Sequence, residues 1–488
     1  MLNLKKNEMN LKRAIKRARE RDIIIPTFQQ MQNPELIPDQ VKEKLKEIGL
    51  WELHPFNLFR ITWKNEPVAQ GGGFGDVNIM ELSGELTGVD ARIIGLVGKW
   101  FPTGSHKVGA TFGCLVPKLV TGQFDPSHHK AVWPSTGNFC RGGAYDASLL
   151  ACESIAILPE EMSQERFEWL STVAGEVIKT PGCESNVKEI FDKCGELRKT
   201  REDIVVFNQF DEFGNYLWHY SVTGNAAEET LRKTMSEQER FAGFVATSGS
   251  AGTVSGCGDY LKEKFPACTV AVGEALQCPT LLLNGFGGHR IEGIGDKHVP
   301  WIHNVRNTDM VIAIDDNDCM SLIRLFNEPA GKEYLKKQGI SESLVNSLAL
   351  LGISSISNLL AAIKFSKYYE LTSKDVILTV FTDSMELYGS RLEELRQTHG
   401  KYSEHEASKD SHCSLLGAKM DHMLELNHYD RKRIHNLKYF TWVEQQGKDV
   451  DELNAQWDDH PGYWMRIQSN ADELDRLIEE FNQKTGLL

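Results

Sequence analysis

Short apolar runs rich in β-branched residues recur along the chain from residue 92 onwards, and amphipathic segments separate many of them. Runs of this kind are typical of buried strands, whereas apolar positions three and four residues apart indicate helices. The pattern predicts strands at residues 92–97, 130–133, 154–158, 176–179, 204–207, 243–246, 269–272, 310–314 and 376–381. Strands that alternate with helices indicate an α/β fold with largely parallel sheets.

Both ends of the chain show a different pattern. Residues 1–60 look mainly helical and begin with a basic segment that lacks the apolar core of a secretory signal. The segment 400–488 is rich in aromatic and charged residues and contains an amphipathic run at 472–481. We expect this second segment to be a helical extension that covers the core or a dimer interface.

The stretch 99–110 joins the first predicted strand to a helix. Pro102–Gly104 break the strand, Ser105 stands where an N-cap is expected, and Lys107 falls in the first helical turn. The positive end of the helix dipole repels an ammonium group there. A lysine with a lowered pKa, or one that forms a Schiff base, would explain this placement. A surface lysine after a turn explains it equally well, so this stretch alone leaves both interpretations open.

Three further loops follow predicted strands, where parallel sheets bind their ligands. The loop 133–139 (Trp-Pro-Ser-Thr-Gly-Asn-Phe) offers backbone N–H groups and short polar side chains that suit a carboxylate or a cofactor oxygen. The small-residue loop 247–256 opens a helix and suits a phosphate monoester, because it lacks the Gly-Lys-Ser/Thr ending of nucleoside triphosphate loops. The loop 381–384 places polar residues at the end of the last strand. Each loop is also compatible with an ordinary turn.

Composition narrows the classes of function. The formal net charge of −14 over 488 residues argues against a general affinity for nucleic acid. The longest apolar runs are far shorter than a membrane span, so we expect no membrane partner. Ten scattered cysteines without a C-x-x-C pair suit a reducing cytoplasm, and the histidines of the tail lack metal-ligand spacing. We therefore predict a cytoplasmic protein without a metal site.

In their order along the chain, the lysine, the Ser-Thr-Gly-Asn loop, the small-residue loop and a strand-end serine resemble one family. It is the tryptophan-synthase-β-like (fold type II) family of pyridoxal-phosphate enzymes, and the motifs are closest to its cysteine synthase and cystathionine β-synthase branch. The resemblance runs from about residue 92 to 391. It implies pyridoxal 5'-phosphate as cofactor and two three-layer α/β domains with largely parallel sheets. We place a large cofactor-binding domain at 61–110 and 225–398, a small substrate-side domain at 111–224, and helical extensions at 1–60 and 399–488.

The resemblance also implies roles for individual residues. Lys107 looks like the catalytic lysine that forms the internal aldimine. Asn138 looks like the asparagine that binds the ring hydroxyl of the cofactor, and Ser384 like the serine that meets the pyridine nitrogen. The remaining assignments are a substrate-carboxylate site (Ser135, Thr136, Gly137 and Phe139) and a phosphate cradle (Gly249, Ser250, Ala251, Gly252 and Thr253). The segments Glu-Gly-Ile-Gly at 292–295 and Gly-Ile-Ser-Ser at 352–355 also match the cysteine synthase branch.

These roles imply a reaction class. A serine cannot keep the pyridine nitrogen protonated, so the cofactor is a weaker electron sink, which disfavours transamination and suits loss of a group from Cβ. We expect β-elimination (a lyase) or β-replacement on a small L-amino acid such as cysteine or serine, through an aminoacrylate intermediate. The sequence motif around Lys107 is closest to that of tryptophan synthase. The loop that carries the indole-binding glutamate of tryptophan synthase is absent, so we do not expect indole chemistry.

Three alternatives stay open at this point. The protein could be a cysteine or cystathionine synthase-type transferase, the β subunit of an aminoketopentanoate-type thiolase, or a non-catalytic sensor that binds pyridoxal phosphate. In each enzyme reading the partner is a small amino-acid substrate. We expect a homodimer or a higher homo-oligomer.

Overall fold

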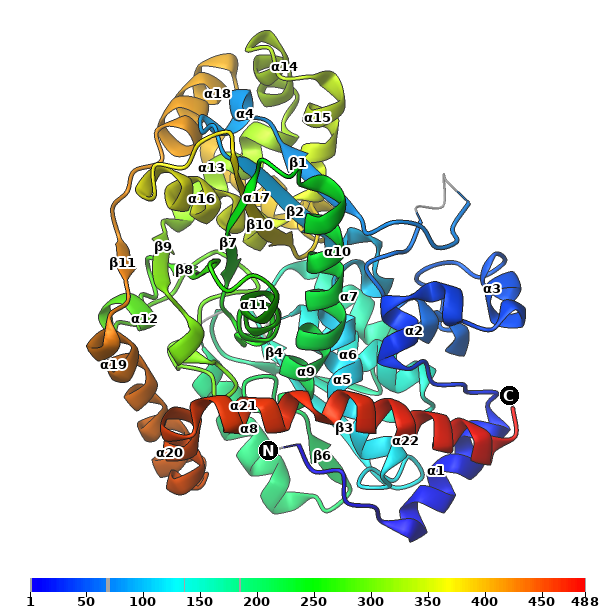
Figure 1. The fold of residues 1–488 in the computed structure, drawn as a ribbon. Coiled ribbons are helices and arrows are strands. Elements are labelled where there is room, and N and C mark those ends of the chain that lie inside the picture. Colours follow the sequence, from blue (N-terminus) through cyan, green and yellow to red (C-terminus); the bar gives the residue numbers. More distant parts are fainter. Residues whose placement is uncertain (1, 67–70, 136, 184–185, 488) are drawn as a thin grey trace.

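A computed structural model describes residues 2–66, 71–135, 137–183 and 186–487, and it shows two β-sheets enclosed by helices (Figure 1). The larger sheet has the strand order β1-β2-β10-β7-β8-β9-β11, and the smaller one has the order β5-β4-β3-β6. The strands of the two sheets are β1 (Ile79–Leu82), β2 (Arg92–Val97), β3 (Lys130–Pro134), β4 (Glu153–Pro159), β5 (Glu176–Thr180), β6 (Ile204–Val206), β7 (Arg240–Thr247), β8 (Thr269–Ala275), β9 (Met310–Ile314), β10 (Asp375–Phe381) and β11 (Met423–Glu425).

The pairing of these strands confirms the predicted α/β class. The smaller sheet is parallel throughout, and the larger sheet is parallel from β2 to β9. All nine predicted strands are present. The sequence pattern missed β1 and β11, which are the two antiparallel edge strands. They are short and only partly buried, so their apolar signal is weak.

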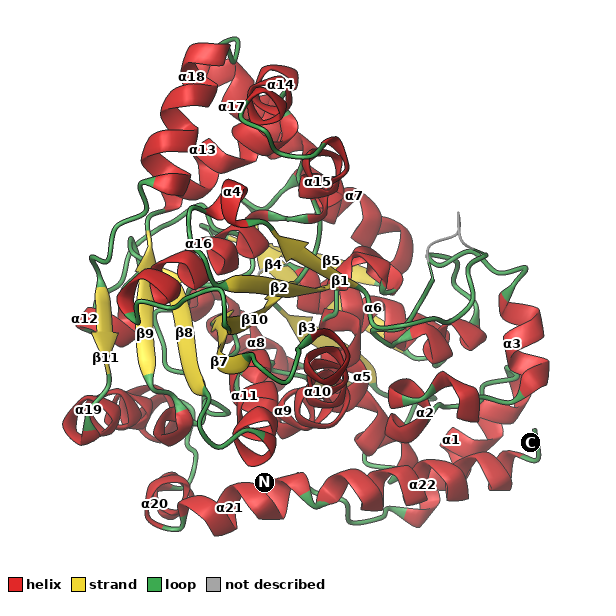
Figure 2. Ribbon diagram, turned by 45° about the horizontal axis from the view of Figure 1, so that its top comes forward, coloured by secondary structure: helices red, strands yellow, loops and turns green. Residues whose placement is uncertain are grey.

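Helices cover both faces of the larger sheet, as parallel strands require (Figure 2). The helix α16 (Ile353–Tyr368) lies on one face and is buried from Ile353 to Ser366, while α11 (Gly252–Lys264) lies on the other face. The remaining α-helices are α1 (Glu8–Glu20), α2 (Phe28–Gln32), α3 (Asp39–Leu45), α4 (Gly84–Thr87), α5 (Lys107–Val120), α6 (Asn138–Leu149), α7 (Gln164–Val173), α8 (Val187–Thr200), α9 (Phe213–Trp218), α10 (Gly224–Thr234), α12 (Thr280–Leu283), α13 (Asp316–Asn327), α14 (Pro329–Lys337), α15 (Glu342–Ser347), α17 (Gly389–His399), α18 (Glu404–Asp410), α19 (His428–Lys438), α20 (Val450–Asp458), α21 (His460–Gln468) and α22 (Asn470–Thr485).

The two ends of the chain pack against each other. Figure 1 shows α22 beside α1. Asn482 on α22 exchanges two hydrogen bonds with the backbone of Ile25, at 3.0 and 2.8 Å. The carboxylate of Asp475 accepts the N–H of Phe28, at 2.6 Å, at the start of α2. The C-terminal segment therefore covers the core together with the N-terminal one, and it also contributes β11 to the larger sheet, so it is not purely helical.

The boundaries predicted for the two domains stay a prediction. The strands of the larger sheet come from residues 79–97, 240–314, 375–381 and 423–425, and those of the smaller sheet from 130–206. Among the described residues, no single helix is long and apolar enough to cross a membrane, although one pair bent by 119°, Glu342–Leu350 with Ile353–Tyr368, meets the criterion by length and composition together.

Candidate active site

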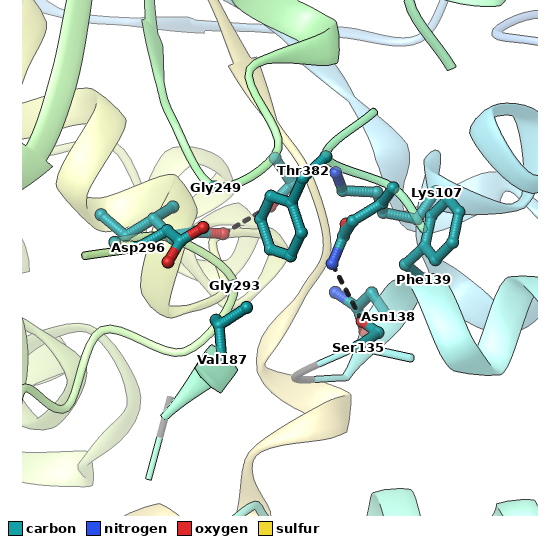
Figure 3. Close-up of a pocket in the computed structure, with 14 residues that line it drawn as sticks. Lys107, Ser135, Asn138, Phe139, Val187, Gly249, Gly293, Asp296 and Thr382 are labelled. Carbon is teal, nitrogen blue, oxygen red and sulfur yellow. Dashed lines mark hydrogen bonds between the residues drawn. The ribbon is translucent and has the colours of Figure 1, made fainter. Parts of the chain in front are cut away.

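One cavity lies where the carboxyl ends of strands from both sheets meet (Figure 3). Such an edge is where α/β proteins bind ligands. Loops after β2, β3, β7, β8 and β10 all contribute to its wall. The lining residues are Lys107, Ser135, Asn138, Phe139, Val187, Gln209, Phe210, Gly249, Gly293, Ile294, Gly295, Asp296, Ser354 and Thr382.

Lys107 is the first residue of α5, as predicted, but the residue before the helix is not the predicted N-cap. His106 occupies the N-cap position with helical backbone angles (φ −61°, ψ −11°). Ser105 stands one residue earlier with an extended backbone, and its Oγ lies 3.4 Å from the backbone nitrogen of Lys107. Ser105 thus stands one residue further from the start of α5 than predicted, although its Oγ accepts the N–H of Lys107 as a capping side chain would.

The amine of Lys107 reaches the predicted phosphate loop. Its Nζ donates a hydrogen bond to Oγ of Ser250 at 3.2 Å, and Nδ2 of Asn215 donates to the same oxygen at 3.0 Å. Asn215 lies on α9, and its Oδ1 is buried without a hydrogen-bond partner among the described residues. The structure thus brings together two sequence-predicted residues that are 143 positions apart.

The loop before α11 has the geometry of an anion cradle. Ala251 adopts a left-handed backbone (φ +61°) directly before the first helical turn. A Cβ on Gly252 would come within 2.2 Å of Oδ1 of Asn215, and one on Gly249 would come within 2.9 Å of the carbonyl of Gly293. Only small residues fit this turn, which presents the N–H groups at the start of α11. Gly249 lines the cavity, whereas Ala251 and Gly252 lie behind the wall.

Behind the cradle, the hydroxyl of Thr253 lies between two fully buried imidazoles. Its Oγ1 is 3.2 Å from Nε2 of His106 and 3.3 Å from Nε2 of His219. Burial lowers the pKa of His106 to about 3, with the positive charge of Lys107 adding to the effect. Burial also lowers the pKa of His219 well below its usual range, with His106 and Lys107 contributing. Both rings are therefore neutral near pH 7.

The neutral state fixes the direction of these hydrogen bonds. Nδ1 of His106 faces the carbonyl of Thr382, at 3.3 Å, and must carry the proton. Its Nε2 is then an acceptor, so the hydroxyl of Thr253 donates to it and accepts from His219. The proton of this hydroxyl is thus committed to His106. In this arrangement Thr253 can offer an anion its backbone N–H.

We predict that acid destabilises the fold through these histidines. Between pH 6.5 and about 3, His106 binds a proton in the unfolded chain but not in the folded one, so the free energy of unfolding falls as pH falls. Its share of the slope approaches ~1.4 kcal/mol per pH unit. Urea unfolding of the wild type and of His106→Gln between pH 7 and 4.5 measures it. The variant should show a shallower slope, and the exposed His128→Gln should not; equal slopes for all three would contradict the prediction.

Asn138 connects the two sheets. It begins α6 beside the smaller sheet, and its Nδ2 donates to Oδ2 of Asp383, at 2.6 Å, after β10 of the larger sheet. The hydroxyl of Tyr388 donates to the same oxygen, also at 2.6 Å. Tyr388 in turn accepts from Arg166, which is paired with the buried carboxylate of Glu292 at 2.7 Å. Burial raises the pKa of Asp383. Oδ1 of Asn138 is buried without a partner among the described residues.

The predicted substrate-carboxylate residues surround the start of α6. Ser135 and Phe139 line the cavity, and Gly137 is buried between them in sequence. Oγ of Ser135 accepts the N–H of Gly137 at 3.1 Å and the amide of Gln209 at 3.3 Å. Thr136 lies outside the described residues. Gln209, which the sequence analysis did not single out, follows β6 and is a further candidate for this subsite.

Ser384 lies beside the cavity rather than in its wall. Its side chain is buried, and its Oγ has no hydrogen-bond partner among the described residues. Two hydroxyls that do line the cavity are those of Thr382 and Ser354, which are 2.6 Å apart. The role of Ser384 at the pyridine nitrogen therefore stays a prediction, and Thr382 and Ser354 are additional polar groups on that side.

A carboxylate that the sequence analysis did not assign also lines the cavity. Asp296 ends the glycine-punctuated segment after β8, and its Oδ2 is buried without a hydrogen-bond partner among the described residues. Oδ1 accepts two hydrogen bonds from His298. Figure 3 shows Asp296 on the side of the cavity away from Lys107 and Asn138. The only sequence signal was its place directly after Gly-Ile-Gly.

These residues fit a phosphorylated, ring-containing cofactor. The turn at 249–253 is shaped for an anion, and Lys107 offers an amine beside it. Oδ1 of Asn138, in the cavity wall, and Oδ1 of Asn215, against Gly252 of the turn, are buried acceptors without partners among the described residues. Buried polar atoms in native proteins are normally satisfied, so these two indicate a polar group that binds here.

Comparison with known proteins agrees with this chemistry. The family model described as "Pyridoxal-phosphate dependent enzyme" matches residues 100–332. A cysteine synthase B of Campylobacter jejuni is 31% identical over 239 residues, 49% of this chain and 71% of the relative. A probable cysteine synthase of Bacillus subtilis is 29% identical over 287 residues, 59% of this chain and 85% of the relative.

A solved structure shows the same fold. The hydrogen sulfide-producing enzyme of Fusobacterium nucleatum matches with a TM-score of 0.54 and 26% identity, over 68% of this chain and 92% of that one. The family model covers the lining residues from Lys107 to Asp296 but not Ser354 and Thr382. The cofactor is pyridoxal phosphate, and the chain belongs to the family of pyridoxal-phosphate-dependent enzymes of amino-acid metabolism.

Proposed function

We propose that this enzyme removes or replaces the Cβ substituent of a small L-amino acid such as cysteine or serine. The observation that carries the proposal is a cavity that holds two proton-transfer groups, the amine of Lys107 and the carboxylate of Asp296, on different sides. One group can serve Cα, and the other can serve the substituent on Cβ. The names of the relatives, cysteine synthases and a hydrogen sulfide-producing enzyme, support the same substrate class.

Different parts of the cavity wall would bind the cofactor and the substrate. The turn at 249–253 would hold the cofactor phosphate, and Asn138 the ring hydroxyl. The hydroxyl of Ser135 and the N–H groups at the start of α6 suit the substrate carboxylate, because the positive end of a helix favours an anion. Phe139, Val187 and Phe210 give part of the cavity wall an apolar surface.

Lys107 and Asp296 would each carry out one of the two proton transfers. When bound, pyridoxal phosphate supplies the electron sink that makes the Cα–H bond acidic. Nζ of Lys107 takes the Cα proton, and the Cβ–S or Cβ–O bond breaks with its electron pair leaving on sulfur or oxygen. We assign the proton on that leaving group to Asp296, which gives it up from its carboxyl form and in elimination regains one from solvent. For cysteine in elimination, the balance is cysteine plus water giving pyruvate, ammonia and hydrogen sulfide. In replacement, an incoming thiol returns a proton to Asp296 as its sulfur bonds to Cβ.

Product analysis with three amino acids tests the proposal. The holoenzyme is incubated with L-cysteine, L-serine or L-alanine in D₂O, and sulfide, pyruvate and deuterium at Cα are measured. Cysteine or serine should give products, whereas alanine, which has no Cβ leaving group, should only exchange its Cα proton. If neither cysteine nor serine gives product, with or without an added thiol, the proposed reaction is wrong.

We also propose that the enzyme is a cytoplasmic homo-oligomer. Nine of the ten cysteines are buried or half-buried, and the sequence has no C-x-x-C pair, which suits a reducing compartment. Light scattering of the full chain tests the assembly: a mass of 55.0 kDa, that of one chain, would contradict it.

A further inference from the structure

Asp296 is held from one side by His298. Nδ1 of His298 lies 3.1 Å from Oδ1 of Asp296, and the backbone N–H of His298 donates to the same oxygen at 3.2 Å. The other carboxylate oxygen, Oδ2, makes no hydrogen bond to the described residues. His298 thus fixes one oxygen of the Asp296 carboxylate. The position of this carboxylate in the cavity wall therefore depends on the loop that carries both Asp296 and His298.

The C-terminal extension binds the next residues of this loop by their backbone. Trp442 donates its indole N–H to the carbonyl of Val299 at 2.8 Å. Lys438 donates its ammonium to the carbonyls of Trp301 and His303, at 3.0 and 2.7 Å. Both side chains are buried, with 1% and 0% of their surface exposed. Three carbonyls of one loop are therefore bound by two side chains of a distant segment.

Lys438 is an unusual way to hold a loop. Its third partner is another neutral oxygen, Oε1 of Gln456, at 2.8 Å. Burial lowers the pKa of Lys438 well below its usual range. A lysine buried among neutral oxygens is costly unless its N–H groups are all bound, and three donors here meet three acceptors. The contact is thus specific in geometry rather than a by-product of apolar packing.

The same extension packs on the apolar side of the cavity. The ring of Phe191 on α8 lies 6.0 Å from Trp442, 5.8 Å from His298 and 6.1 Å from Phe210, measured between centroids. Phe210 lines the cavity, as does Val187 on the same helix as Phe191. The extension therefore contacts both the loop after Asp296 and Phe191, which packs on the cavity residue Phe210.

We infer that the C-terminal extension is a working part of the active site, in which Trp442 and Lys438 are positioning residues that hold the loop 296–303 and keep the Asp296 carboxylate at the cavity. The inference rests on the proposed role of Asp296 in proton transfer. The family match ends at residue 332, so the contact joins the matched region to a segment outside it. Figure 1 shows α19 to α22 running from β11 along the side of the molecule to α1.

A matched pair of tryptophan variants tests the inference. Trp442→Phe removes the N–H that binds Val299 and keeps an aromatic ring. Trp464→Phe, in the same apolar cluster, removes an indole N–H that has no partner among the described residues. Hydrogen–deuterium exchange of the holoenzyme should show residues 296–303 exchanging about tenfold faster in Trp442→Phe than in Trp464→Phe. Equal exchange in the two variants would overturn the inference, whatever the reaction of the enzyme.

Kinetics give the second readout. Trp442→Phe should slow product formation about tenfold while Cα-proton exchange of alanine stays within twofold of wild type. In an Asp296→Asn background, Trp442→Phe should cause no further loss, because the group that it positions is gone. A full tenfold loss in that background would also overturn the inference. Lys438→Gln, which retains one donor group, is the second variant and should show the same pattern if Trp442→Phe does not fold.

Discussion

Lys107→Ala is expected to abolish turnover, with a loss on the order of 10⁴-fold. The amine stands at the start of α5, hydrogen-bonded at 3.2 Å to the loop that would hold the cofactor phosphate. The variant loses both the group that takes the Cα proton and the nitrogen that attaches the cofactor. Cα-proton exchange of alanine should therefore disappear together with product formation from cysteine.

Two controls separate chemistry from folding in this experiment. Lys99→Ala removes a lysine from the same stretch that pairs with Glu386 instead of lining the cavity, and it should retain turnover within a fewfold of wild type. Added methylamine should partly restore Cα exchange in Lys107→Ala, because a small amine can occupy the space of the lost side chain. Unchanged exchange in Lys107→Ala would remove Lys107 from the mechanism.

Asp296→Asn is expected to have the second-largest effect, a loss of product formation of about 10²-fold with Cα exchange retained. Asparagine has nearly the shape of aspartate and can still accept a hydrogen bond from His298, but it cannot carry a proton between the cavity and the sulfur or oxygen on Cβ. The two variants thus predict opposite outcomes for one assay, since Lys107→Ala loses Cα exchange and Asp296→Asn keeps it.

The control for this variant is Asp318→Asn, a half-buried carboxylate on α13 outside the cavity wall. It should leave both product formation and Cα exchange near wild type. If Asp296→Asn instead slows both activities equally, Asp296 acts on binding or on the Cα step, and its assignment to the leaving group is wrong.

The residues predicted from the sequence share one property. Lys107, Asn138 and the turn at 249–253 each lie between an apolar strand and the first turn of the helix that follows it, and the carboxyl ends of parallel strands meet at one edge of a sheet. Each local pattern alone also suited an ordinary turn, so it was the order of the motifs along the chain, and their resemblance to one family, that placed them at a common site. Ser105 shows the limit of that approach, since a shift of one residue in the helix start depends on backbone angles that no local pattern specified.

The remaining parts of the site come from positions without a local signal. Asp296 lies far along the chain after β8, and His219 lies within a helical segment that becomes a neighbour of His106 only when α9 packs on α5. Trp442 and Lys438 bind the loop after Asp296 from a segment that the sequence pattern described only as a cover of the core or of an interface. Such residues act through tertiary contacts, so their roles become visible when the chain is folded.

The bond between Asn138 and Asp383 has a consequence for the architecture. It joins the first turn of α6 to the end of β10, at 2.6 Å, and so ties the smaller sheet to the larger one at the cavity itself. The cluster of Arg166, Glu292 and Tyr388 continues this connection away from the cavity. Polar contacts therefore fix the position of the two sheets relative to each other, and they lie around the residues that would contact cofactor and substrate.

The central claim is that pyridoxal phosphate is bound covalently by Lys107. Borohydride reduction of the holoenzyme, followed by proteolysis and mass spectrometry, measures this directly. The cofactor mass should appear on the peptide that contains Lys107 and should be missing from that peptide in Lys107→Ala. A reduced cofactor found on another lysine of the wild type, or no covalent adduct in a protein saturated with cofactor, would contradict the account.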